Sequence, residues 1–97
     1  MDDDDRELLE SLHRELAATE ELPVSREASA WLGEAQAVAR GLLDAPEPVV
    51  AERIGHVRHL LGEAGDPGNE AVAEHLERAR DLAAEVATAV EGGQDRS

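Results

Sequence analysis

The sequence predicts an all-α protein that folds as an up-down antiparallel four-helix bundle. In four segments, apolar residues recur at intervals of three and four, the spacing that places them on one face of a helix. Short segments containing Pro or Gly separate these stripes, and such short connections put successive helices antiparallel. We therefore expect helices over residues 6–22, 25–44, 48–64 and 69–91.

The first two helices are indicated by their apolar stripes and by the break between them. The stripe of the first helix comprises Leu8, Leu9, Leu12, Leu16, Thr19 and Leu22. Leu22-Pro23-Val24 interrupts it, and Ser25 can cap the second helix because its hydroxyl can accept from an amide one turn in. The second helix has the most regular stripe of the chain, formed by Ala28, Trp31, Leu32, Ala35, Val38, Ala39, Leu42 and Leu43.

The last two helices follow a segment that cannot be helical. Pro46 and Pro48 lack amide donors and restrict the residues before them, so the second helix ends there and a third begins. Gly65 is expected to end the third helix with a positive φ, and Asp66 or Asn69 to cap the fourth. The predicted inward faces are Val49, Val50, Ile54, Val57, Leu60, Leu61 and Ala64, and then Val72, Leu76, Ala79, Ala83, Val86 and Val90.

Around these helices we expect a simple domain organisation. Residues 1–5 form an acidic N-terminal extension, residues 6–91 a single helical domain, and residues 92–97 a disordered tail that has nothing to bury. A chain of 97 residues fits one domain, but the core will be thin because aromatic residues, which carry the largest areas, make up 1%.

A shift of 44 residues aligns the two halves of the chain. It places Leu16 on Leu60, Leu32 on Leu76, and the cap Ser25 on Asn69. Two interpretations stay open. Either one helical hairpin is used twice, or Ala-rich amphipathic helices match one another through their shared period.

The charge balance points to an environment more than to an activity. There are 23 Asp and Glu residues against nine basic ones, all of them Arg, and the formal net charge is −14. Carboxylates hold water and salt ions well, whereas a Lys stem exposes apolar surface. In composition the whole chain resembles small acidic haloarchaeal proteins, which implies a salt-rich cytoplasm and folding that depends on salt.

Several function classes are disfavoured by the same composition. The absence of Cys excludes disulfides and thiolate sites, and no apolar run approaches the length of a membrane span. A strongly negative chain without a basic stripe would be repelled by nucleic acid. No catalytic motif or glycine-rich phosphate loop is visible, so we expect neither an enzyme nor a cofactor.

The strongest constellation of chemical groups lies in the third predicted helix. Glu52, His56, His59 and Glu63 follow one another at steps of four, three and four, which stacks them along one line. We favour the interpretation that these residues form a solvated edge of the helix, where each His interacts with a neighbouring carboxylate. The alternative is a site for zinc or another divalent ion, which would need a further ligand from His13 or His75.

The segment 56–62 loosely resembles histidine phosphotransfer domains, which are four-helix bundles with a phosphorylatable His on an exposed helix face. The resemblance implies His56 as the phosphoryl carrier. In that family a Lys and then a Gly occupy the third and fourth positions after the active His. Here His59 and Leu60 stand there, which removes the cation and the clearance that the chemistry uses.

Small residues suggest where a partner could bind. Gly inside a helix costs about 0.5–1 kcal/mol relative to Ala, a cost that close approach of another backbone would offset. A lone Trp at a bundle edge can likewise anchor an interface. The candidate interface residues are Trp31, Gly33, Gly41, Ala51, Gly55 and Gly62. Halophilic composition alone would also explain the small residues.

These observations favour a non-enzymatic helical interaction or scaffold protein, with a homodimer as its specific form. The alternative is a His/Glu metal-binding or phosphotransfer-like carrier centred on His56. Mimicry of DNA by the acidic surface is a weaker third hypothesis, because salt adaptation already explains the charges. The expected partner is a protein or a second copy of the chain, with no nucleic acid and no membrane.

Overall fold

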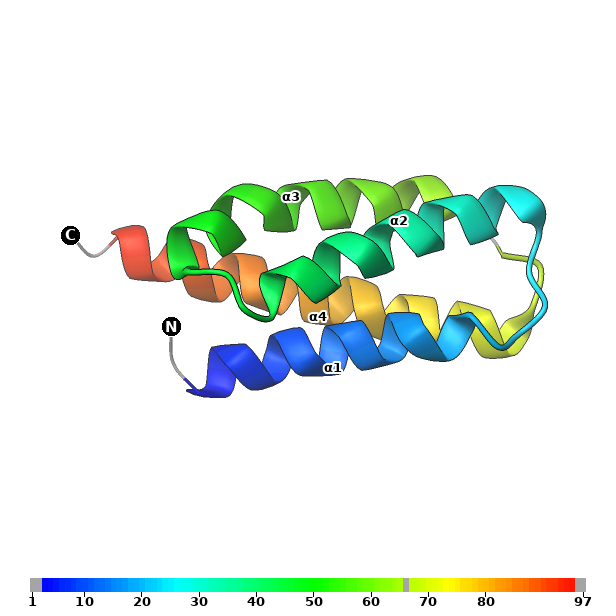
Figure 1. The fold of residues 1–97 in the computed structure, drawn as a ribbon, viewed down its shortest axis with the longest axis horizontal. Helices are drawn as coiled ribbons and strands as arrows, with labels where there is room; N and C mark the ends of the chain where they lie inside the picture. Colours follow the sequence, from blue (N-terminus) through cyan, green and yellow to red (C-terminus); the bar gives the residue numbers. More distant parts are fainter. Residues whose placement is uncertain (1–2, 66, 96–97) are drawn as a thin grey trace.

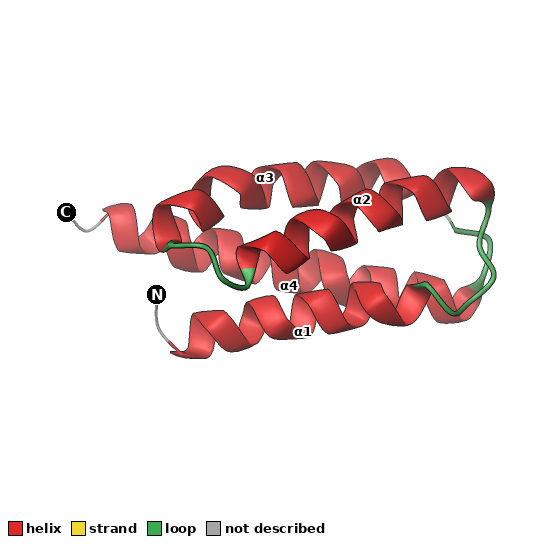
Figure 2. Ribbon diagram, viewed as in Figure 1, coloured by secondary structure: helices red, strands yellow, loops and turns green. Residues whose placement is uncertain are grey.

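A computed structural model describes residues 3–65 and 67–95, with side chains through Val90. Its helices are α1 (Asp3–Thr19), α2 (Arg26–Leu42), α3 (Glu47–Ala64) and α4 (Glu70–Asp95). They lie side by side along a rod of 44 × 20 × 18 Å (Figure 1; Figure 2). Asp66, one of the two predicted caps of the fourth helix, lies outside the described residues.

The predicted up-down four-helix bundle is confirmed. α1 packs against α4 and α2, and α3 packs against α2 and α4, so successive helices are neighbours around the bundle. The α1–α4 and α2–α3 pairings are the most extensive, and the α1–α2 pairing is the least extensive. The groove between α1 and α2 is therefore where the bundle is most loosely closed.

The core consists of most of the predicted inward faces together with Ala87. The remaining predicted residues are only partly buried at its edge, namely Leu8, Leu22, Trp31, Val38, Leu43 and Val49. Leu9, Leu12 and Leu16 of α1 are fully buried. Thr19 is also buried, and its hydroxyl donates to the Leu16 carbonyl at 2.6 Å. Small side chains at the centres of α2 and α4 let the helices approach closely, since interiors pack to crystal-like density. These are Ala35, Ala39, Ala79 and Ala83, all fully buried.

The helix caps are confirmed as predicted. The Ser25 hydroxyl accepts a hydrogen bond from the Ala28 amide at 3.1 Å, and Asn69 Oδ1 accepts from the Ala71 amide at 2.9 Å. Gly65 follows α3 with a φ of +57°, a conformation that side chains with a Cβ rarely adopt.

The two ends of the chain differ from the prediction. The expected acidic extension is wrong for residues 3–5, because α1 begins at Asp3 and uses these carboxylates in its first turn, where they face the positive end of the helix dipole. The expected tail is wrong for residues 92–95, because α4 continues to Asp95. Once a helix is nucleated, each added residue gains a backbone hydrogen bond, which offsets the cost of Gly.

Burial reveals a two-fold repeat with a small change of register. A shift of 44 residues carries the five buried positions of α2 onto buried positions of α4, from Ala28 on Val72 to Leu42 on Val86. In α1, however, the shift is 45, from Leu9 on Ile54 to Thr19 on Ala64. The connection 65–69 is one residue shorter than the connection 20–25, which accounts for the change. The two hairpins thus share a pattern of burial, which either a repeated hairpin or a shared amphipathic period produces.

Candidate functional site

The predicted His/Glu line lies on the outer surface of α3. Glu52, His56, His59 and Glu63 are all exposed. Among these four described residues, one ion-pair contact forms, between His59 Nε2 and Glu63 Oε1 at 4.0 Å, and the two side chains are 62% and 49% exposed. This arrangement fits the solvated edge that the sequence favours, since exposed pairs of this kind contribute little to stability.

The structure does not assemble a metal site from these residues. Across the described residues, no three His, Asp or Glu side chains converge closely enough to hold a metal ion. Two side chains one turn apart on a helix can share a metal ion, but four residues spread over three turns do not converge on one ion, so a third ligand would have to come from a second helix. His13 and His75 lie on α1 and α4, and neither supplies that ligand.

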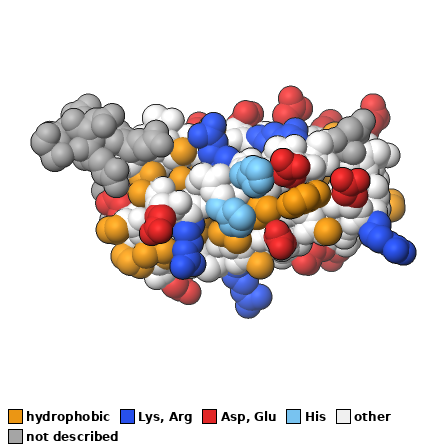
Figure 3. Space-filling view, turned by 90° about the horizontal axis from the view of Figure 1, so that it is seen from above, with side chains coloured by type: hydrophobic (Ala, Val, Ile, Leu, Met, Phe, Trp, Pro, Cys, Tyr) orange, Lys and Arg blue, Asp and Glu red, His pale blue; other side chains and the backbone are white. Residues whose placement is uncertain are grey.

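His56 borders a shallow depression between α2 and α3. The depression measures about 500 Å³ and is lined by Ala37, Val38, Gly41, Glu52, Arg53 and His56. Figure 3 views this face, where hydrophobic side chains lie among acidic and arginine side chains and two histidines sit near the middle. At the position where phosphotransfer domains carry Gly, Leu60 is a core residue.

The candidate interface residues do not form a single surface. Only Gly41 lines the α2–α3 depression, whereas Gly33 lines a pocket on the α1 side of α2. Trp31 and Ala51 are partly buried against the core. A Cβ added to Gly33, Gly41, Gly55 or Gly62 would meet nothing within 4 Å. Packing within the bundle therefore does not require glycine at these positions.

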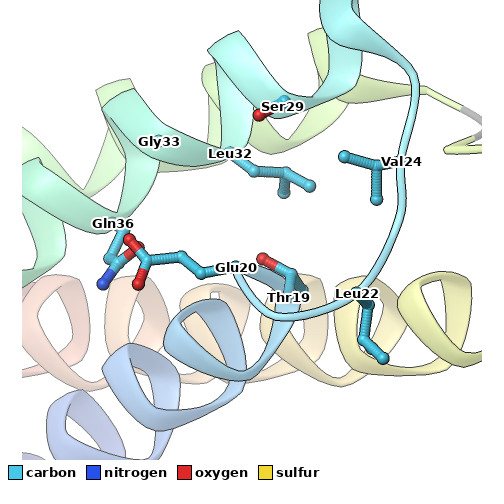
Figure 4. A pocket seen from close by; sticks show the side chains of 8 residues that line it. All are labelled: Thr19, Glu20, Leu22, Val24, Ser29, Leu32, Gly33 and Gln36. Carbon is cyan, nitrogen blue, oxygen red and sulfur yellow. The ribbon is translucent and has the colours of Figure 1, made fainter.

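A pocket that sequence reasoning missed lies under the α1–α2 connection (Figure 4). It measures about 320 Å³ and is lined by Thr19, Glu20, Leu22, Val24, Ser29, Leu32, Gly33 and Gln36. The Val24 and Leu32 side chains extend into the space between loop and helix, and Glu20 and Gln36 also line the pocket. The apolar residues flanking Pro23 were its only signal in the sequence.

A polar cluster joins α1 to α4. Glu15 Oε1 accepts from Arg78 Nε at 3.0 Å and lies 2.7 Å from His75 Nδ1, which donates to it. These contacts, led by the His75 hydrogen bond, lower the pKa of Glu15 despite its partial burial. The spacing of Glu74 and Arg78 predicts a pair within α4, but Arg78 turns to α1 instead.

Two arginines cap helix C-termini from a neighbouring helix. Arg80 of α4 donates to the carbonyls of Leu61 at 2.8 Å and Gly65 at 3.4 Å, at the end of α3. Arg6 of α1 donates to the Leu43 carbonyl at 3.1 Å, at the end of α2. A cation at this position satisfies free carbonyls and opposes the negative end of the helix dipole.

These features define a small helical-bundle protein with an acidic surface, pockets between its helices and no assembled metal centre among the described residues. A family model described as a domain of unknown function, DUF8152, matches residues 8–92, and the chain belongs to that family. No curated protein and no solved structure matches the chain. In the part of the chain that the structure describes, no helix is long and apolar enough to cross a membrane.

Proposed function

We propose that the chain is a non-enzymatic helical interaction module that self-associates through its α2–α3 face in a salt-rich cytoplasm. The observation that carries this proposal is the placement of Trp31, the one aromatic residue of the sequence. It packs at the edge of the core and remains partly exposed. A Trp in this position supports an interface, because it brings a large contact area with few rotatable bonds.

Other residues extend the apolar surface beside Trp31. Val38 lies two helical turns further along the same side of α2, is only partly buried, and lines the α2–α3 depression with Gly41. Val49, two turns before His56 on α3, is also partly buried. Glu52 and Arg53 bring both charge signs to the rim, so two copies related by a two-fold axis could pair opposite charges across it.

The acidic surface supports the second part of the proposal. With a net charge of −14, two copies repel one another at low salt. At about 1 M salt the Debye length falls to roughly 3 Å, and this repulsion fades while apolar burial remains. Self-association should therefore strengthen as KCl rises, the opposite of what an interface held by ion pairs would show.

Light scattering after size-exclusion chromatography in low and multimolar KCl tests the proposal with a matched pair of variants. Gly41→Glu places a carboxylate in the α2–α3 depression, where there is room for its Cβ. Thr88→Glu adds the same charge to an exposed position on the α1–α4 side. We expect a dimer in high salt that Gly41→Glu dissociates and Thr88→Glu preserves. A wild-type chain that is monomeric in high salt would rule out self-association.

A further inference from the structure

The α1–α2 pocket has a counterpart in the second hairpin. A pocket of about 500 Å³ between α3 and α4 is lined by Gly65, Pro67, Ala73, Leu76, Glu77 and Arg80. The shifts of 45 and 44 residues that relate the buried positions of the two hairpins also relate the residues of the two pockets. The six lining residues of the second pocket correspond, in the order given, to Glu20, Leu22, Ser29, Leu32, Gly33 and Gln36 of the first pocket. The bundle therefore forms the same pocket twice.

The two pockets differ in the group that reaches the end of the preceding helix. In the second hairpin, the Arg80 guanidinium donates to the Leu61 and Gly65 carbonyls. In the first, Gln36 stands at the position of Arg80, and the corresponding carbonyls belong to Leu16 and Glu20. The Leu16 carbonyl accepts from the Thr19 hydroxyl at 2.6 Å, which leaves it a second lone pair.

The electrostatics of the first pocket favour a cation more strongly than those of the second. Neither α1 nor α3 has a basic residue in its last turn, but Gln36 stands where Arg80 reaches the end of α3, and Glu20 and Glu21 follow α1 directly. Their carboxylates add to the negative end of the helix dipole. In the described residues, neither of them forms an ion pair. Gly33, which replaces Glu77, removes a side chain from the pocket's edge.

We infer that the α1–α2 pocket binds a guanidinium group carried on a short aliphatic chain, the group that ends an arginine side chain. The planar cation takes the place that Arg80 fills in the second hairpin and donates to the end of α1 and to Glu20. Leu22, Val24 and Leu32 contact the aliphatic stem. The volume of about 320 Å³ lies at the lower end of the range for small-molecule sites.

A titration of the full chain with butylguanidinium tests the inference, read by NMR at Thr19, Val24 and Leu32. Butylammonium matches the charge, and butylurea matches the shape without charge. In high KCl, where association with the acidic surface is screened, we expect saturable shifts at the pocket with butylguanidinium alone. The absence of shifts, or equal shifts with butylammonium spread over the acidic surface, would overturn the inference.

Two variants locate the binding. Gln36→Arg supplies the guanidinium within the chain, so it should raise the melting temperature and abolish the butylguanidinium shifts. Ala37→Arg adds the same charge to the neighbouring, exposed position on α2, which lines the α2–α3 depression, and should leave binding intact. Circular dichroism checks that both variants fold. If Gln36→Arg folds and still binds butylguanidinium, the pocket is not the site.

A third arm distinguishes the source of the group. A blocked Gly-Arg-Gly peptide presents arginine as a protein would, whereas butylguanidinium represents a free metabolite. Binding of both with similar affinity would indicate that the guanidinium itself is sufficient. Much tighter binding of the peptide would assign the pocket to an arginine of a protein partner. If neither binds, no guanidinium site exists.

Discussion

The two helical hairpins bury corresponding residues, but they differ in the charged residues at the end of their first helix. Each buried position of α1 corresponds to a buried position of α3, although α3 also buries Val50 and Leu60, and the buried positions of α2 correspond to those of α4 until α2 ends. In the second hairpin, Arg80 satisfies the end of α3. In the first, Glu20 and Glu21 follow α1, and Gln36 stands at the position of Arg80. Apolar burial thus sets the fold, while the polar residues around each connection are free to diverge.

A second difference lies at the junction between the hairpins. Glu15 of α1 occupies the position that corresponds to Leu60, a buried residue of α3. It reaches across to His75 and Arg78 of α4, so the α1–α4 pairing includes a hydrogen-bonded charge cluster. The equivalent α2–α3 pairing has an apolar side chain at this point. Specific polar contacts therefore distinguish the α1–α4 pairing from the α2–α3 pairing.

The largest expected effect tests whether the cores are equivalent. Leu32→Ala and Leu76→Ala remove corresponding buried side chains, and each should lower the free energy of unfolding by about 2–5 kcal/mol. Urea denaturation in high KCl measures both, with exposed Ala30→Ser as a control that should change little. If Leu32→Ala lowered the free energy of unfolding by less than half as much as Leu76→Ala, the two hairpins would share positions of burial but not their contribution to stability.

An intermediate effect should come from the arginine that distinguishes the second hairpin. Arg80→Gln introduces the residue of the first hairpin and should cost about 1–2 kcal/mol, because two carbonyls lose a charged donor. Arg6→Gln should lower the free energy of unfolding by only about a few tenths of a kcal/mol, because the Arg6 side chain is 57% exposed. Thermal melts in high KCl provide the comparison. Equal losses would show that burial does not decide the strength of these caps.

A further, modest effect should depend on pH. At neutral pH, Glu15→Gln should cost about 1 kcal/mol, because His75 and Arg78 lose their charged acceptor. The folded state lowers the pKa of Glu15, so its contribution is complete above the ordinary Glu pKa of ~4.3 and disappears as pH falls through the lowered value.

Urea denaturation of the wild type and Glu15→Gln across this range checks the sign. The stability difference should narrow on acidification, and Glu74→Gln, an exposed change on α4, should show no such trend. A difference that widened as the pH fell would mean that Glu15 is stabilised in its protonated form.

The four helices could be predicted from the spacing of apolar residues in the sequence, because burial of apolar surface is the largest favourable contribution to folding. Ser25 and Asn69 were also predictable as caps, since their side chains satisfy amides only one turn away. The start of α1 and the end of α4 could not be predicted. Their composition suggested solvated, non-helical segments, whereas the helices extend into them.

The candidate sites were harder to predict, since they depend on contacts between distant residues. Local spacing paired Arg78 with Glu74, whereas the fold offers it Glu15, sixty-three residues away. The α1–α2 pocket arises from a connection and two helices, and no residue within it carries a motif. Its significance becomes visible only by comparison with the second hairpin, where Arg80 fills the equivalent role.

Asn69 uses its two amide atoms for different tasks. Oδ1 caps α4, while Nδ2 donates to the Pro23 carbonyl at 3.0 Å and so ties the two loops at this end together. Loss of the side-chain nitrogen by spontaneous deamidation, or its mimic Asn69→Asp, keeps the capping oxygen and removes only the tie. Chemical ageing at this one residue would then release one loop from the other while α4 stays capped and the packed helices stay in place, a change that hydrogen exchange at the loop amides would detect.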